Sequence, residues 1–135
     1  MAQQKTRPSD ADVQAFLEAV TPTVRREDGL RLARILQEVT GADPVLWGPS
    51  IVGYGSYRIP STGGEWPKVG FSPRRAQLSI YGLKDLPAGA RVLPALGEYT
   101  EGAGCVYVKR LDAVDEAVLR KLAEIAWSRG DDDEE

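Results

Sequence analysis

The sequence predicts an α+β domain in which an antiparallel sheet of about four to five strands carries its helices packed on one face. Two observations lead to this class. Apolar residues recur at helical spacing near both ends of the chain, whereas from Val45 onward the apolar period changes to two. The links between the expected strands are short and rich in Gly, Pro and Ser, which is typical of antiparallel neighbours.

Two helices are expected before the strands. Ser9 is the expected cap of the first helix, whose buried face is formed by Val13, Phe16, Leu17 and Val20. The second helix has the same spacing at Leu32, Ile35, Leu36 and Val39. It is expected to end at Gly41, and Gly29 weakens its first turns.

Strands are expected around residues 51–58, 65–71, 77–81 and 105–109. Leu78 and Ile80 alternate with polar neighbours, so one face of the sheet should be covered and the other largely wet. An irregular helix is expected near residues 91–96, and a closing helix should begin at Asp112 and stop at Gly130. The predicted order is α-α-β-β-β-(α)-β-α.

The length of 135 residues fits a single domain, expected over residues 9–130. Residues 1–8 and the acidic tail at 131–135 are expected to be disordered. The formal charge is −3, and without the five acids of the tail the chain carries 17 basic and 15 acidic residues. This balance lacks the basic excess of a nucleic-acid-binding domain. Because no signal segment or long apolar run is visible, a cytoplasmic location without membrane association is expected.

The residue inventory excludes several chemistries. The chain contains no histidine and one cysteine, Cys105. Ser-His-Asp and Cys-His catalysis, an internal disulfide and a thiolate zinc site are therefore excluded. Cys105 is interpreted as an inert thiol of a strand. The protein is expected to be a binding domain rather than an enzyme, and no cofactor is expected.

Three ordered motifs carry a family resemblance. They are Trp47-Gly48-Pro49-Ser50-Ile51-Val52-Gly53-Tyr54-Gly55, then Gly70-Phe71-Ser72-Pro73-Arg74, and finally Gly102 with Cys105-Val106-Tyr107-Val108 and Asp112-Ala113-Val114-Asp115. With these motifs the chain resembles the YdhG-like family of bacterial domains of unknown function. The resemblance implies an α/β fold similar to frataxin and, for some members, a role as an intracellular iron chaperone. The lysines associated with the family before the last strand are replaced here by Glu98, Thr100, Glu101 and Ala103.

The leading hypothesis is a non-catalytic intracellular binding module for a small ligand, which would be anionic if arginines hold it. Its first part is the glycine and aromatic loop, with candidate residues Trp47, Gly48, Ser50, Gly53 and Tyr54. Its second part is a convergence of Arg58, Lys68, Arg74 and Arg75 beside Ser72. The structural alternatives are a bulged strand with a tight turn for the loop and solvated turn residues for the cations. The partner, a small molecule or a protein, stays open.

The second hypothesis is a frataxin-like iron chaperone. Iron would need hard oxygen ligands, and the first two helices offer Asp10, Asp12, Glu18, Glu27 and Asp28. Acidic residues in a first helical turn also stabilise the helix by themselves, so a purely structural role is the alternative.

Overall fold

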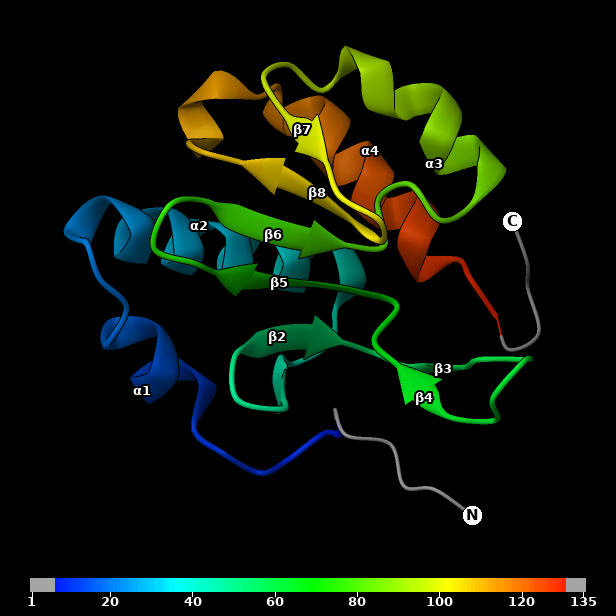
Figure 1. Ribbon diagram of the computed structural model, residues 1–135, viewed down its shortest axis with the longest axis horizontal. Coiled ribbons are helices and arrows are strands. Elements are labelled where there is room, and N and C mark those ends of the chain that lie inside the picture. Colours follow the sequence, from blue (N-terminus) through cyan, green and yellow to red (C-terminus); the bar gives the residue numbers. More distant parts are fainter. Residues whose placement is uncertain (1–6, 131–135) are drawn as a thin grey trace.

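A computed structural model of the chain describes residues 7–130, and its frame is an open antiparallel sheet (Figure 1). Six strands follow the order β1-β2-β5-β6-β8-β7. Their bounds are β1 Val45–Trp47, β2 Ile51–Tyr54, β5 Val69–Pro73, β6 Leu78–Tyr81, β7 Thr100–Glu101 and β8 Cys105–Val108. A separate two-stranded sheet is formed by β3 Tyr57–Arg58 and β4 Glu65–Trp66.

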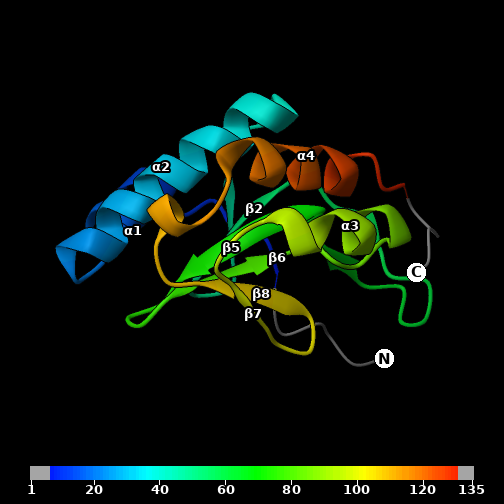
Figure 2. The same cartoon turned by 90° about the horizontal axis from the view of Figure 1, so that it is seen from above.

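Four helices complete the fold, namely α1 Val13–Glu18, α2 Thr23–Thr40, α3 Pro87–Val92 and α4 Glu116–Trp127. Two short 3-10 turns, η1 Leu93–Ala95 and η2 Leu111–Ala113, follow α3 and β8. Helices α2 and α4 pack side by side across one face of the sheet (Figure 2). In Figure 1 the strands lie in front of these two helices, so the viewer looks onto the opposite face of the sheet, called the uncovered face below. Trp47, Ser72 and Ser79 on that face are nevertheless buried, so the prediction of a largely wet face is wrong at these positions. The predicted α+β class, with helices on one face, is confirmed.

The sheet has more strands than the sequence predicts. The edge strands β1 and β7 have only three and two residues, which is too short for a recognisable alternation. The two long strands expected at 51–58 and 65–71 are each divided, because the chain leaves the main sheet to form the β3–β4 hairpin. Gly55, with a φ of 64°, marks the first division, and Pro67 lies at the second.

The core lies between the sheet and the helices. Alternate strand residues face it, and these positions are Val52, Tyr54, Val69, Phe71, Leu78, Ile80, Val106 and Val108. The second helix ends at Gly41 as predicted. The helix α2 continues through the buried Gly29, where an added Cβ atom would lie at an ordinary contact distance of 3.7 Å from both Leu17 and Pro73.

Both predicted helix caps are wrong. Asp12 caps α1 by accepting a hydrogen bond from Ala15 N, and Asp115 caps α4. Ser9 instead bonds to Leu46 O through its N–H and its hydroxyl, because the chain before α1 runs along the edge of β1. Asp112 lies in η2, one turn too early for the cap of α4.

Ordered contacts at the beginning of the described chain start before Ser9. Pro8 forms an antiparallel bridge with Trp47, and Gly48 N donates to Arg7 O at 2.9 Å. The expected disorder therefore does not extend over residues 7 and 8. Residues 1–6 and the predicted acidic tail at 131–135 lie outside the described residues.

Candidate functional site

Three rows of side chains cross the uncovered face of the sheet. The register and the alternation of strand residues assign them. The first row consists of Val45, Gly53, Gly70, Tyr81 and Cys105, and the second of Trp47, Ile51, Ser72, Ser79, Tyr107 and Thr100. The third row lies just beyond the ladder, where Arg74 N donates to Gln77 O and Lys109 follows the last residue of β8.

Arg74 is held along this face by neutral hydroxyl groups. Its Nε donates to Ser72 Oγ at 3.2 Å, and its second terminal nitrogen donates to the Tyr81 hydroxyl at 3.4 Å. Ser72 Oγ donates in turn to Ser50 Oγ at 3.2 Å. No carboxylate of residues 7–130 pairs with the Arg74 guanidinium. Within this described range, a positive charge is thus positioned without a counter-charge.

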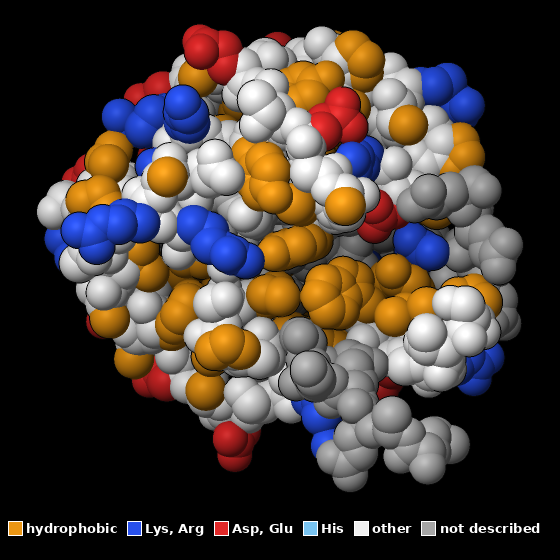
Figure 3. Space-filling model, in the orientation of Figure 1, with side chains coloured by type: hydrophobic (Ala, Val, Ile, Leu, Met, Phe, Trp, Pro, Cys, Tyr) orange, Lys and Arg blue, Asp and Glu red, His pale blue; other side chains and the backbone are white. Residues whose placement is uncertain are grey.

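Aromatic residues lie beside this charge. The Trp66 ring meets the Tyr81 ring edge-on, with centroids 5.9 Å apart and planes at 86°. The pKa of Tyr107 is raised above its ordinary value, chiefly by a hydrogen bond to the Cys105 side chain. The charge of nearby Arg74 acts in the opposite direction and is the smaller effect. Figure 3 shows hydrophobic side chains gathered over the middle of the uncovered face, with Lys and Arg side chains beside them near the β5–β6 turn.

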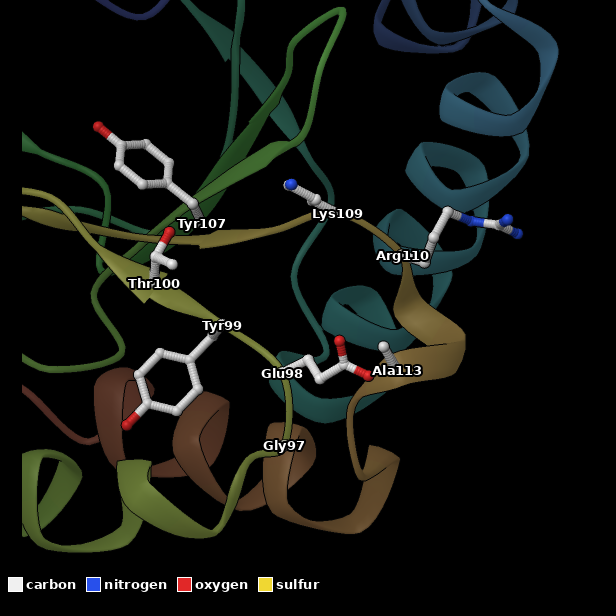
Figure 4. Close-up of a pocket in the computed structure, with 8 residues that line it drawn as sticks. All are labelled: Gly97, Glu98, Tyr99, Thr100, Tyr107, Lys109, Arg110 and Ala113. Carbon is white, nitrogen blue, oxygen red and sulfur yellow. The ribbon is translucent and has the colours of Figure 1, made fainter.

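A pocket of about 570 Å³ opens at the β7 end of the same face (Figure 4). Its lining residues are Gly97, Glu98, Tyr99, Thr100, Tyr107, Lys109, Arg110 and Ala113. Tyr107 and Thr100 also belong to the second row of the uncovered face. The exposed Lys109 ammonium has no ion-pair partner among the described residues, whereas Arg110 bonds to Asp28. Within residues 7–130 the Lys109 ammonium is therefore a second cation without an ion-pair partner, although the Glu98 carboxylate lines the same pocket.

The structure brings five of the predicted site residues to this face, namely Trp47, Ser50, Gly53, Ser72 and Arg74. Gly48 lies beside them in the β1–β2 turn, at a φ of 60°. The loop is nevertheless no anion cradle. The backbone of Gly53 pairs with β1 and β5, and a Cβ atom there would lie 2.7 Å from both the Trp47 ring and Pro67. This geometry supports the structural alternative for the glycine.

Other predicted residues lie elsewhere. Tyr54 faces the core, where its hydroxyl donates to Ala33 O at 2.8 Å and burial raises its pKa. Arg58 lies in the β3–β4 hairpin, and Lys68, which precedes β5, contacts the Trp127 ring at 4.9 Å. Arg74 follows the opposite end of β5, so the predicted convergence of the four cations is wrong. Arg75 lies exposed in the turn after Arg74.

The acidic residues predicted for iron have separate roles. Asp12 caps α1, Glu18 accepts a hydrogen bond from Gln14, and Asp10 and Glu27 are exposed. Asp28 is 5% exposed and bonds to the segment after β8. Within residues 7–130 no group of three Asp, Glu or Cys side chains is arranged to hold a metal ion.

Sequence reasoning missed four residues of this face: Trp66, Tyr81, Tyr107 and Lys109. The alternation of Leu78 and Ile80 with Ser79 and Tyr81 could have placed Tyr81 on the uncovered face. No sequence signal places Trp66 against it, because that contact depends on how the β3–β4 hairpin folds back.

Comparisons with known proteins give no relative: no family model matches the chain, and no curated protein or solved structure matches it either. The resemblance to the YdhG-like family therefore stays a prediction from the motifs. Over the described part of the chain, every helix is too short or too polar to cross a membrane.

Proposed function

We propose that the protein binds a small anionic ligand without covalent chemistry, on the uncovered face of the sheet between Arg74 and Lys109. The observation that carries this proposal is a pair of cations on one face, beside a pocket, that have no ion-pair partner within residues 7–130. Arg74 directly follows β5 and Lys109 directly follows β8, and only β6 lies between these two strands in the sheet. Neighbouring strands are about 5 Å apart, so their α-carbons are separated by about 10 Å.

Hydroxyl groups next to the two cations supply further hydrogen-bond donors. Tyr107 lies in the second row, next to the row of Arg74 and Lys109, and the Tyr81 hydroxyl accepts a hydrogen bond from Arg74. A tyrosine hydroxyl is protonated at neutral pH, so that of Tyr107 can donate to an oxyanion. Hydrogen bonds to charged groups contribute about 1.5–3 kcal/mol each. A few such bonds account for micromolar to millimolar affinity.

Binding without catalysis fits the groups present. General-base catalysis needs a group whose pKa lies near the working pH. Among the described residues of this face, the hydroxyl, thiol, amide and charged side chains belong to Tyr, Ser, Thr, Cys, Gln, Arg and Lys besides Glu98. The Cys105 side chain is buried and bonded to Tyr107. The arrangement therefore supports recognition of an anion more than its conversion.

The test is an NMR titration of the isotope-labelled protein with inorganic phosphate and with acetate at constant ionic strength. We expect saturable shifts of amides in β5, β6 and β8. Arg74→Ala and Lys109→Ala should each weaken phosphate binding about tenfold, the equivalent of 1.4 kcal/mol.

Two variants serve as matched controls. Arg34 is exposed on α2 and Lys121 is exposed on α4, both helices that cover the other face. Arg34→Ala and Lys121→Ala should leave the affinity unchanged. Shifts that do not saturate, or equal losses in all four variants, would show only non-specific screening and would contradict the proposal.

A further inference from the structure

We infer that the preferred ligand is a zwitterion, with an ammonium group as well as the anionic group. This inference rests on the proposed function and specifies its ligand class. Its basis is the position of Glu98, which lines the same pocket as Lys109. A pocket that recognised only an anion would not be expected to place a carboxylate beside its cation.

Glu98 and Lys109 approach the pocket from neighbouring segments. Thr100, the first residue of β7, pairs with Tyr107, whereas Glu98 lies beyond this ladder and its backbone bonds to Ala113, so the two segments have separated where Glu98 and Lys109 line the pocket. In Figure 4 the two side chains extend from different sides of the open space. Their charged groups are not within ion-pair distance of each other, and neither forms an ion pair with another residue of the range 7–130.

The backbone keeps Glu98 at this position. Its N–H donates to Ala113 O at 3.1 Å, and the preceding Gly97 forms an antiparallel bridge with Val114. The segment before β7 is therefore tied to the segment before α4, independently of the Glu98 side chain. The carboxylate faces the pocket because of the fold and is not held there by a salt bridge.

Electrostatics then favours a ligand with both charges. A purely anionic ligand at Lys109 would be repelled by the Glu98 carboxylate, which faces the same space. A ligand whose ammonium group lies next to Glu98 replaces that repulsion with attraction. A phosphate or carboxylate joined to an ammonium group by a short carbon chain carries both charges in one molecule.

Two probes that differ only in the ammonium group test the inference, namely O-phosphoethanolamine and ethyl phosphate. Each is titrated into the wild-type protein, into Glu98→Gln and into Glu124→Gln, and the dissociation constant is measured by NMR. Glu124 is exposed on α4, so Glu124→Gln changes the net charge equally at a distant place. The wild type and Glu124→Gln should bind O-phosphoethanolamine about tenfold more tightly than ethyl phosphate.

The Glu98→Gln variant should lose this preference, since ethyl phosphate gains affinity and O-phosphoethanolamine loses it. Equal affinity of the wild type for the two probes, or an unchanged preference in Glu98→Gln, would overturn the inference and leave the anion site intact. If neither probe binds the wild type, the proposed function fails together with the inference.

Discussion

The carboxylate of Asp28 and the backbone N–H of Leu111 form a buried hydrogen bond of 3.0 Å that joins α2 to the segment after β8. The same oxygen, Oδ2, also accepts from Arg110 Nε at 3.2 Å. Since Asp28 is 5% exposed, these bonds form away from bulk water. An acidic residue that the sequence offered as an iron ligand is thus a structural connection between two elements.

Asp28→Ala should lower the free energy of unfolding by about 1–3 kcal/mol, because the Leu111 N–H remains buried without an acceptor. Urea denaturation monitored by circular dichroism measures this change. Glu27→Ala, an exposed neighbour on the same helix, should change stability by less than about 0.5 kcal/mol. Equal effects of the two substitutions would show that the bond to Leu111 contributes nothing specific.

Tyr54→Phe should destabilise the fold by about 1 kcal/mol without changing phosphate binding. The substitution removes only the hydroxyl that donates to Ala33 O, inside the core. Thermal unfolding gives the stability, and the NMR titration described above gives the affinity. A loss of phosphate affinity in a folded Tyr54→Phe protein would show that Tyr54 contributes to the ligand site and would contradict this prediction.

Gly70→Ala should destabilise the sheet by about 1–3 kcal/mol, since a Cβ atom at this position would lie 2.6 Å from Val52 O on the adjacent strand. The backbone of a central strand cannot move away from this contact without a large cost in free energy. Gly104→Ala is the matched control, because no atom lies within 4 Å of the added Cβ. Equilibrium unfolding should separate the two variants clearly, and similar stabilities would contradict the close approach of β2 and β5.

Glu116 should contribute to stability near neutral pH and lose that contribution in acid. Its carboxylate accepts from Arg31 at 3.1 Å and from Arg120 at 3.0 Å, and these bonds hold its pKa below the ordinary value of 4.5. A carboxyl group whose pKa is lower in the folded state stabilises above its unfolded pKa, and the effect disappears as the pH falls through the folded value.

The stability difference between wild type and Glu116→Gln should therefore be largest at pH 7 and shrink below about pH 4.5. Urea unfolding at a series of pH values measures it. Glu124→Gln, at an exposed position without an ion pair in the described chain, should give a difference that changes little with pH. A pH-independent difference for Glu116→Gln would contradict the ion-pair assignment.

The helices were largely predictable, whereas the edges of the sheet were not. The long helix α2 and the last helix α4 have apolar residues at helical spacing over several turns, and this pattern is local. The strands β1 and β7 form only through pairing with β2 and β8, and this pairing is not visible in the local sequence. Ser9 does not cap α1, because its hydroxyl donates to Leu46 O, 37 residues away in the sequence. A local sequence pattern does not show that such a distant acceptor competes for the hydroxyl.

The sequence by itself determined the α+β class, the amphipathic helices and, through the lack of histidine, the exclusion of histidine-dependent chemistry. Only the tertiary structure decided which polar residues share a face. Hydrogen bonds connect Ser72 to Ser50 and Arg74 to Tyr81 on one face, whereas the Tyr54 side chain lies in the core. The physical reason is strand register, because a shift of one residue moves every side chain of a strand to the opposite face.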